Sequence, residues 1–375
     1  MSRRRRSRQK GGRRPMSELT TRAGQMATGS FEAGSDGVPL VERHDAVLLD
    51  LDGVVYLGEQ PVPRAASAID AVRSQGVAVR FVTNNAARRP AAVAELLTRV
   101  GVPAHTAEVV TSAQAAGWTL AQRLPEGSRI LVVGAPALAE EVAAVGLQPV
   151  TSADEQPVAV VQGYGPTVGW PQLAEAAVAL RQGALWVATN TDRTLPSVRG
   201  PLPGNGALVA ALSHAMQRQP DIVVGKPEPA LLLGAAQNAE AARPVMVGDR
   251  LDTDVEGAVR AGMDSLLVFT GVSTPAEVLT APPQQRPTYL AEDLTGLLQV
   301  HPPTVRVPDG AQCRGWQVRR GPKGWELTGD GAPLDALRAL CGAVWAEAPQ
   351  TAASLDPIIG GTASAVDALR TLGLS

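Results

Sequence analysis

The sequence predicts an α/β fold with a Rossmann-like parallel sheet as its core, an inserted α/β domain and a small α+β extension at the C-terminal end. Short apolar runs alternate with segments of helical spacing, which is typical of strands covered by helices on both faces. Polar residues follow several of these apolar runs. The interval between two of these polar strand ends, Thr83 and Lys226, is long enough for an inserted domain. With 375 residues, the chain is long enough for more than one hydrophobic core.

The apolar runs define the expected strands, and the amphipathic segments define the expected helices. The expected strands are Ala46–Leu51, Val77–Val82, Ile130–Gly134, Pro157–Gly163, Ala184–Thr189, Ile222–Gly225, Val245–Gly248 and Ser265–Phe269. The expected helices are Ala65–Gln75, Pro90–Val100, Leu173–Arg181, Gly206–Gln217, Ala230–Ala236, Asp254–Ala261 and Leu334–Glu347. Gly315–Arg319 and Trp325–Thr328 predict a β-hairpin.

The charge of the chain is unevenly distributed. The net charge is −2, yet the first fourteen residues carry eight basic groups and no acid. Residues 1–43 are polar and rich in Gly and Ser, and we expect a disordered tail. One interpretation of this tail is a contact with nucleic acid or anionic lipid. The favoured interpretation is a solvated tail, or a translation start at Met16 or Met26, because a run of charge alone is weak evidence for a partner. The remaining chain is mildly acidic, so no nucleic-acid partner is expected.

Cysteine usage and hydropathy favour a cytoplasmic protein. Cys313 and Cys341 are too few for a disulfide framework and lack metal-ligand spacing. No apolar stretch reaches the length of a membrane span, and no apolar segment follows the basic start, so neither a membrane contact nor a secretory signal is expected. A homo-oligomer is compatible with the sequence, which does not determine the oligomeric state.

Two acids follow the first expected strand. Asp50 and Asp52 are two residues apart, so their side chains share a face in an extended segment. In open α/β sheets, ligands bind at the carboxyl ends of the strands. One acid could be an ionised nucleophile and metal ligand, while the other, with a raised pKa, acts as general acid and base. The alternatives are a loop with solvated acids and a calcium loop, although the preceding strand argues against an EF-hand.

Three further strand ends carry polar groups. Thr83 and Asn84 end the second strand, where they could bind a phosphate oxygen or cap a helix. Lys226 is the one lysine between Lys10 and Lys323, and it could neutralise phosphate charge or be an ordinary surface lysine. Asp249 and Asp254 offer the hard oxygen ligands that suit Mg²⁺, or N-cap a helix.

Together these segments resemble the haloacid dehalogenase (HAD)-like hydrolase superfamily. LLDLDGVVY is similar to its first motif, FVTNN to its second, GKPEP to its third and GDRLDTD to its fourth. The order and layout are most similar to the NagD-like and 4-nitrophenylphosphatase-like subgroup, and in particular to its actinobacterial glycerol-3-phosphate phosphatase group. The resemblance covers residues 45–299.

The resemblance implies a Mg²⁺-dependent phosphatase acting through an aspartyl-phosphate intermediate. By resemblance, Asp50 is the nucleophile and Asp52 the general acid and base. Thr83, the backbone at Asn84, and Lys226 bind the phosphoryl group. The metal ligands implied are Asp50, the Asp52 carbonyl and Asp249, with Asp254 behind them. The implied substrate is a small phosphorylated metabolite, with glycerol 3-phosphate favoured over phosphoglycolate, a sugar phosphate, pyridoxal phosphate or a nucleoside monophosphate.

Motif spacing locates the substrate-selecting cap. Between Asp52 and Thr83 there is room for a hairpin and one helix, whereas the interval from Thr83 to Lys226 is too long for a single connection. We expect the core at 44–113 and 219–300 and a cap at 114–218, which matches the family's type-two cap. Within the cap, the candidate leaving-group contacts are Asn190, Asp192 and Arg193; the alternative is an ordinary turn in which Gly204 and Gly206 supply backbone freedom.

The extension at 304–375 is too small for an independent core and is expected to pack on the main body. In the glycerol-3-phosphate phosphatase group, a comparable extension resembles a fragment of an acetyltransferase fold. No acetyl-CoA loop is visible here, so no acetyltransferase activity is expected.

Three rival functions are less consistent with the sequence. A phosphomutase of this fold carries its cap between the first two motifs, where this chain has no space. In a non-enzymatic interaction protein we would expect substitutions at the catalytic positions. All five of these residues are present, namely Asp50, Asp52, Thr83, Lys226 and Asp249. A dinucleotide-binding enzyme needs a Gly-x-Gly-x-x-Gly after a strand, and LVVGAPALA is a poor substitute.

Overall fold

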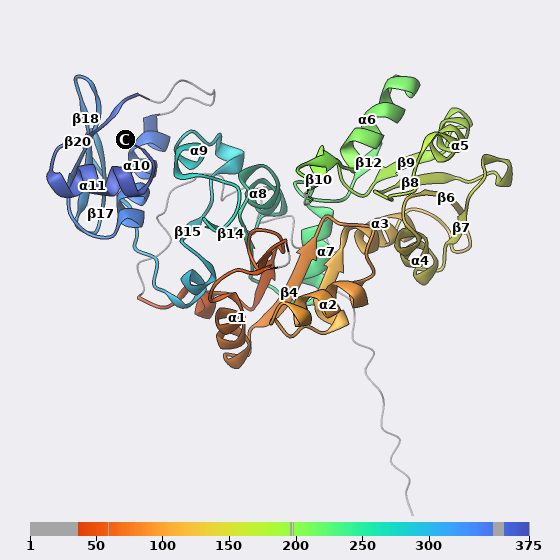
Figure 1. Cartoon of the computed structure of the whole chain (residues 1–375), viewed down its shortest axis with the longest axis horizontal. Coiled ribbons are helices and arrows are strands. Elements are labelled where there is room, and N and C mark those ends of the chain that lie inside the picture. Colours follow the sequence, from red (N-terminus) through yellow and green to blue (C-terminus); the bar gives the residue numbers. More distant parts are fainter. Residues whose placement is uncertain (1–36, 59, 196, 198, 348–355, 375) are drawn as a thin grey trace, which may run out of the picture.

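The computed structural model describes residues 37–58, 60–195, 197, 199–347 and 356–374. Figure 1 shows three units in a row, with the core sheet in the middle, the cap on one side and the C-terminal unit on the other. Most of the predicted basic tail lies outside the described residues. No helix in the described part of the chain is long and apolar enough to cross a membrane.

The core is a parallel sheet with the strand order β15-β14-β13-β1-β4-β5. Its central strand, β1, is buried along its whole length, as expected for a strand covered on both faces. The strand bounds are β1 (Ala46–Leu49), β4 (Ala78–Thr83), β5 (Val109–Thr111), β13 (Pro244–Gly248), β14 (Asp264–Val268) and β15 (Tyr289–Ala291). The helices of this unit are α1 (Ala65–Ser74), α2 (Pro90–Arg99), α3 (Ser112–Ala121), α7 (Ala230–Asn238), α8 (Glu256–Ala261) and α9 (Pro275–Leu279).

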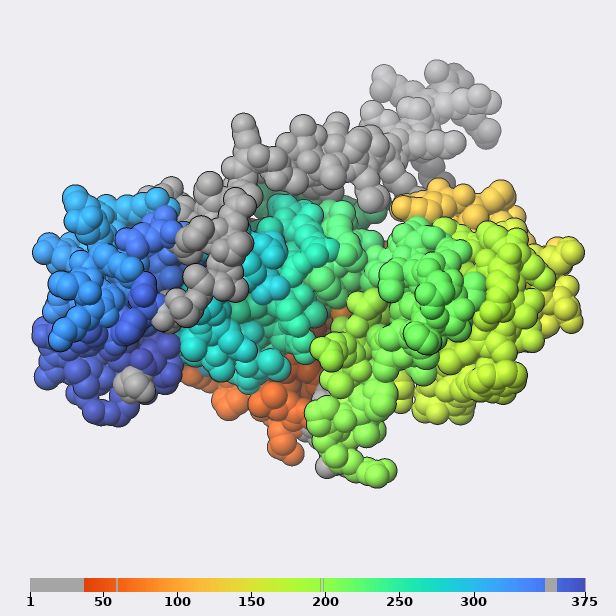
Figure 2. All heavy atoms as spheres, turned by 90° about the horizontal axis from the view of Figure 1, so that it is seen from above, coloured from red at the N-terminus to blue at the C-terminus, as the bar shows by residue number. Residues whose placement is uncertain are grey.

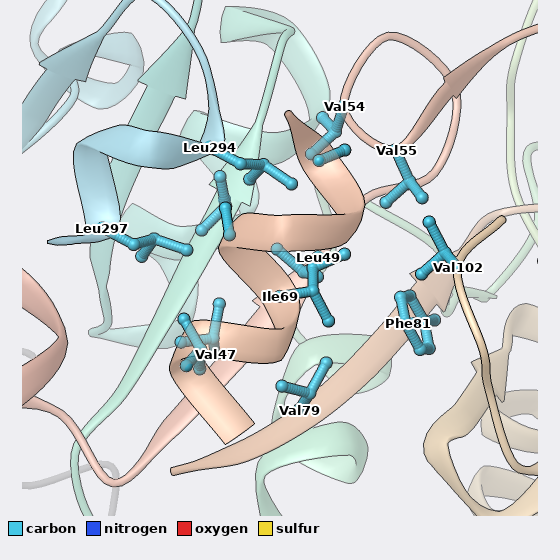
Figure 3. Packing of buried hydrophobic residues seen from close by; sticks show 14 of the residues in the cluster. Val47, Leu49, Val54, Val55, Ile69, Val79, Phe81, Val102, Leu294 and Leu297 are labelled. Carbon is cyan, nitrogen blue, oxygen red and sulfur yellow. The ribbon is translucent and has the colours of Figure 1, made fainter. Parts of the chain in front are cut away.

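Successive residues of β1 serve two different cores. Val47 and Leu49 point into a cluster with Ile69 of α1 and Phe81 of β4, which Figure 3 shows at close range. Leu48 points the opposite way, into a second cluster that also contains Ile130 of the cap. Because side chains alternate across a strand, one short apolar run fills both layers. The second cluster joins core and cap into continuous apolar packing.

The cap holds a second parallel sheet, with the order β12-β9-β8-β6-β7. Its strands are β6 (Arg129–Val133), β7 (Gln148–Val150), β8 (Ala159–Gln162), β9 (Leu185–Ala188) and β12 (Ile222–Val223). Its helices are α4 (Pro136–Ala144), α5 (Trp170–Arg181) and α6 (Asn205–Met216), and β10 (Thr194–Leu195) pairs with β11 (Leu202–Pro203) in a hairpin. A smaller hairpin, β2 (Tyr56–Leu57) with β3 (Gln60–Pro61), follows β1 in the core.

The C-terminal unit is a mixed sheet with two helices. Its strands run in the order β16 (Val305–Val307), β17 (Gly310–Cys313), β18 (Trp316–Gly321), β19 (Gly324–Gly329) and β20 (Ile358–Gly360). Helices α10 (Pro333–Glu347) and α11 (Ala363–Thr371) complete it. Trp316 and Leu340 share one apolar cluster with Leu267 and Val278 of the core, so the extension packs on the main body.

The structure matches the predicted hairpin, the helix that follows it and the eight predicted strands of core and cap. Among the elements that the sequence did not predict are β5, β7, β15, α3 and α4, and the structure differs from the predictions in three further places. Leu40–Arg43, assigned to the disordered tail, is a short 3₁₀ helix in which Leu40 and Val41 are buried. β12 falls in the range expected for the core but pairs with β9 of the cap. The extension is larger than a hairpin and one helix, because β16, β17, β20 and α11 belong to it.

Candidate functional site

Three adjacent strands bring the predicted acids and Thr83 to one edge of the core sheet. β1 lies between β13 and β4, and all three run parallel. Asp50 directly follows β1, Thr83 ends β4, and Asp249 directly follows β13. The amide of Asp50 donates to the carbonyl of Val247 at 2.9 Å, so the hydrogen-bond ladder continues up to the acid. The carboxyl edge of a parallel sheet is where such groups can converge on a ligand.

Lys226 reaches this edge from the end of the cap strand β12. Its Nζ lies 2.6 Å from Oδ1 of Asp50 and 2.6 Å from Oδ1 of Asp254. The lysine is 3% exposed. Burial alone would lower the pKa of Lys226, but the carboxylates of Asp254 and Asp50 raise it by more than burial lowers it. The pKa therefore lies above its ordinary value, and the ammonium stays charged.

Asp249 is fixed by the loop that follows β14. Its Oδ2 accepts a hydrogen bond from the amide of Val272 at 2.7 Å, and its carbonyl accepts one from Ser273 at 3.0 Å. Glycines let this loop and the loop after β1 approach the acid: a Cβ on Gly271 would lie 1.9 Å from Oδ2, and one on Gly53 would lie 2.4 Å from it. Within the described residues, the buried Oδ1 has no hydrogen-bond partner.

One carboxylate oxygen from each of Asp50, Asp249 and Asp254 lies within 4.8 Å of the other two. Burial raises the pKa of Asp249 to about 6, and the neighbouring Asp254 adds to this shift. Burial also raises the pKa of Asp254 to about 6, and that of Asp50 above its usual value, with Lys226 opposing both shifts. Crowded carboxylates and an unpartnered buried oxygen fit a hard divalent cation such as Mg²⁺.

Asp254 is the carboxylate least free to bind a metal. Its Oδ1 accepts from Lys226, and its Oδ2 accepts from the amide of Arg250 at 3.2 Å. A Cβ on Gly248 would lie 2.2 Å from the Cβ of Asp254, so the strand end and the following turn are in close contact. This geometry suits a residue that orients Lys226.

Asp52 lies two residues after Asp50, and Thr83 ends β4 and is buried. Asp52 is exposed, yet partial desolvation by the surrounding protein raises its pKa, while the charge of Arg88 lowers it. A raised pKa is what a proton donor near neutral pH requires. Oγ1 of Thr83 accepts from the amide of Asn85 at 3.1 Å.

The predicted cap residues divide into two groups. Nδ2 of Asn190 donates to the carbonyl of Asn84 at 2.7 Å, and both carboxylate oxygens of Asp192 accept from Nδ2 of Asn84, at 3.2 and 3.3 Å. Arg193 is exposed beside the β10–β11 hairpin. Asn190 and Asp192 therefore face the core at its second strand end, and for Arg193 the structure gives no such contact.

The glycines near this cap loop serve close approach. Neither Gly204 nor Gly206 has a positive φ, so the alternative interpretation, a turn that uses their backbone freedom, does not hold. A Cβ on Gly204 would lie 2.4 Å from the carbonyl oxygen of Asp192, and one on Gly206 would lie 2.2 Å from that of Thr191. The loop lies directly on the start of α6, and any larger residue would displace it.

Sequence reasoning missed two parts of the site. The first is the loop Thr270–Ser273, which holds Asp249 and in which Thr270 Oγ1 donates to the carbonyl of Gly53. Its signal was the polar stretch TGVS directly after an apolar strand. The second is Arg88, whose charge faces Asp52; its only signal was its place after the second strand end.

Family models divide the chain in the same way. A haloacid dehalogenase-like hydrolase model matches residues 47–148, and a HAD-hydrolase-like model matches residues 223–297. A model of a GCN5-related N-acetyltransferase-like domain matches residues 313–374, which is the C-terminal unit.

Similar proteins include the D-glycerol 3-phosphate phosphatase of Mycobacterium tuberculosis, which is 45% identical over 82% of this chain and 87% of its own. An acid sugar phosphatase of Staphylococcus saprophyticus is 34% identical over 69% of this chain and 98% of its own. The crystal structure of the M. tuberculosis glycerol phosphate phosphatase in complex with magnesium superposes with a TM-score of 0.80 at 44% identity, covering 90% of this chain and 99% of that one. The chain therefore belongs to the haloacid dehalogenase-like hydrolases.

Proposed function

We propose that this chain is a Mg²⁺-dependent phosphatase that hydrolyses a small phosphomonoester through an aspartyl-phosphate intermediate. The observation that carries the proposal is the cluster at the sheet edge. Oδ1 of Asp50, the candidate nucleophile, lies 2.6 Å from the buried ammonium of Lys226. A carboxylate oxygen of Asp50 also lies within 4.8 Å of one from Asp249. Phosphoryl transfer depends on alignment and charge neutralisation, and this cluster offers both.

In the first step, a carboxylate oxygen of Asp50 attacks phosphorus. The new O–P bond forms as the P–O bond to the leaving group breaks, and Asp52 gives its proton to the departing alkoxide. Lys226 neutralises phosphoryl charge from the side of Asp50, and Thr83 with the backbone at Asn84 binds phosphoryl oxygens.

In the second step, Asp52 accepts a proton from a water molecule, whose oxygen attacks phosphorus. The bond between phosphorus and the Asp50 oxygen breaks, inorganic phosphate leaves, and the carboxylate of Asp50 and the protonated Asp52 are both restored. The residues proposed to hold the metal are Asp50, Asp249 and the carbonyl of Asp52, with Asp254 acting through Lys226. Bound there, Mg²⁺ would neutralise negative charge on the phosphoryl oxygens.

Glycerol 3-phosphate is the favoured substrate. The similar protein from M. tuberculosis is named for this activity, and its similarity extends through the cap and into the C-terminal unit. A sugar phosphate is the second candidate, because an acid sugar phosphatase is similar over 69% of this chain. We assign substrate selection to the cap at residues 114–218, whose sheet also includes β12. The core comprises residues 44–113 and the rest of 219–300, and the extension at 304–375 packs on it.

We further propose that the enzyme works in the cytoplasm. Cys313 and Cys341 are both free and buried, which suits a reducing compartment.

The test is hydrolysis of 4-nitrophenyl phosphate and of a panel of phosphorylated metabolites by the wild type and by Asp50→Asn. Asp50→Asn keeps the shape of the side chain but lacks the nucleophile, so turnover should disappear. Asp70→Asn, on the exposed surface of α1, is the matched control and should turn over at the wild-type rate. Wild-type turnover by Asp50→Asn would remove the mechanism, and a panel in which another phosphomonoester has the highest kcat/KM would replace glycerol 3-phosphate.

A further inference from the structure

The side chain of Asn84 links the cap to the main chain of Lys226. Its Oδ1 accepts from the amide of Lys226 at 2.8 Å, and its Nδ2 donates to the carbonyl of the same residue at 3.0 Å. The same Nδ2 donates to both carboxylate oxygens of Asp192 in the cap. An amide has two N–H donors and one oxygen acceptor, so all its hydrogen-bonding groups are engaged within the protein.

The main chain of Asn84 makes two more contacts of this kind. Its carbonyl accepts from Oγ of Ser112 at 2.6 Å and from Nδ2 of Asn190 at 2.7 Å. Ser112 begins α3, through which the chain passes from core to cap, and Lys226 lies just after β12, by which it returns. One residue therefore contacts both crossings between core and cap, as well as the cap loop.

The contact between Asn84 and the main chain at Lys226 is close, and it leaves no room for a side chain at the preceding residue, Gly225. A Cβ on Gly225 would lie 2.5 Å from the carbonyl oxygen of Thr189 and 2.8 Å from Oδ1 of Asn84. Figure 2 shows the green cap atoms pressed directly against the teal core atoms. The position of Lys226 along this crossing is thus coupled to the position of the cap loop.

We propose that Asn84 is a positioning residue: it ties the cap loop at Asn190 and Asp192 to the main chain of Lys226, so that the cap contributes to placing the ammonium beside Asp50. The chain of contacts runs from Asp192 through the Asn84 amide to the Lys226 backbone, and along the lysine side chain to Asp50. The neutral amide can face a carboxylate on one side and a peptide group on the other, which a charged residue could not do.

The experiment is a double-mutant cycle between positions 84 and 192. Asn84→Asp keeps the acceptor for the Lys226 amide but places a carboxylate against that of Asp192. Asp192→Asn in the same chain restores a donor opposite that carboxylate. Hydrogen bonds that involve a charged group are worth on the order of tenfold or more in an equilibrium. We expect Asn84→Asp to lower kcat by at least about tenfold, with a smaller rise in KM, and the second change to recover most of the loss.

The kinetic part of this test rests on the proposed phosphatase function, so a second readout is independent of it. Amide hydrogen exchange of residues 189–193 and 224–227 should accelerate in Asn84→Asp and slow again in the double variant. If the wild-type protein had no phosphatase activity, the proposed function would be refuted, but the exchange measurement would still test the role of Asn84.

Asn85→Asp is the matched control for added charge. Asn85 is the adjacent exposed residue, and its side-chain oxygen accepts from the amide of Ala87 at 2.8 Å, a contact that a carboxylate keeps. Its effect on exchange and on kcat should not be relieved by Asp192→Asn. Additive effects of the changes at 84 and 192 in both readouts, or equal relief of Asn85→Asp, would overturn the assignment.

Discussion

Gly271→Ala tests whether the placement of Asp249 determines the activity. Gly271 has no positive φ, so alanine brings no backbone strain there. Its new Cβ would lie 1.9 Å from Oδ2 and 2.5 Å from Cγ of Asp249, where carbon atoms essentially never approach closer than 3.0 Å. The carboxylate must therefore retreat by about 1 Å or more, or the loop must open and give up the hydrogen bond from Val272.

The expected effect is a loss of activity. A displacement of about 1 Å in a catalytic arrangement costs on the order of 100-fold in rate. We therefore expect kcat/KM for 4-nitrophenyl phosphate to fall by about 100-fold, and the Mg²⁺ concentration for half-maximal activity to rise. Gly169→Ala is the control, because its Cβ would meet its nearest neighbour at 3.9 Å, in the cap. Activity within twofold of the wild type, at an unchanged Mg²⁺ requirement, would refute the reasoning.

Three further outcomes follow from the structure. EDTA should abolish hydrolysis of 4-nitrophenyl phosphate and added Mg²⁺ should restore it, whereas full activity in chelator would contradict the metal assignment. Leu40→Ala should lower the free energy of unfolding by about 3 kcal/mol in urea titrations, because Leu40 is buried in the core, while Leu57→Ala at an exposed site should change it little. Burial lowers the pKa of His301 to about 4, so the folded state binds the proton less tightly than the unfolded state does. The stability that depends on neutral His301 is present above about pH 6.5 and is lost as the pH falls towards 4, by about 3 kcal/mol in total. In His301→Gln, urea titrations should show that this part of the pH dependence of the free energy of unfolding is missing. An unchanged pH dependence would contradict its attribution to His301.

The sequence predicted the strands of the core and the residues at their ends for a simple physical reason. A central parallel strand is buried on both faces, so β1 and β13 are unbroken apolar runs, and the first polar residue after each run marks the sheet edge. The same reasoning fails for α3, whose residues are buried on most sides and therefore lack an amphipathic pattern. Strands of two or three residues, such as β7 and β10, are too short to give a periodic signal.

The parts of the site that could not be predicted depend on contacts between distant segments. The Asn84–Asp192 hydrogen bond joins residues 108 positions apart, and the contact of the loop at Gly271 with Asp249 appears only when two strand ends meet. The sequence placed Thr83 and Asn84 at the phosphate through a hydroxyl and a free backbone N–H at this strand end. In the structure the side-chain amide of Asn84 is engaged by Lys226 and Asp192, which leaves the backbone N–H of Asn84 as its group for a phosphoryl oxygen.

Charge balance explains why a neutral residue occupies position 84. Asp50, Asp249 and Asp254 crowd one space, and the ammonium of Lys226 contacts two of them, so the ionised cluster carries two more negative charges than positive ones. A divalent cation bound there would offset this excess. An aspartate at position 84 would add a further negative charge opposite Asp192, and a lysine would compete with Lys226 for the carboxylates. An amide holds the Lys226 main chain by hydrogen bonds and leaves the charge of the cluster unchanged, so this contact with the cap adds no charge beside the phosphoryl site.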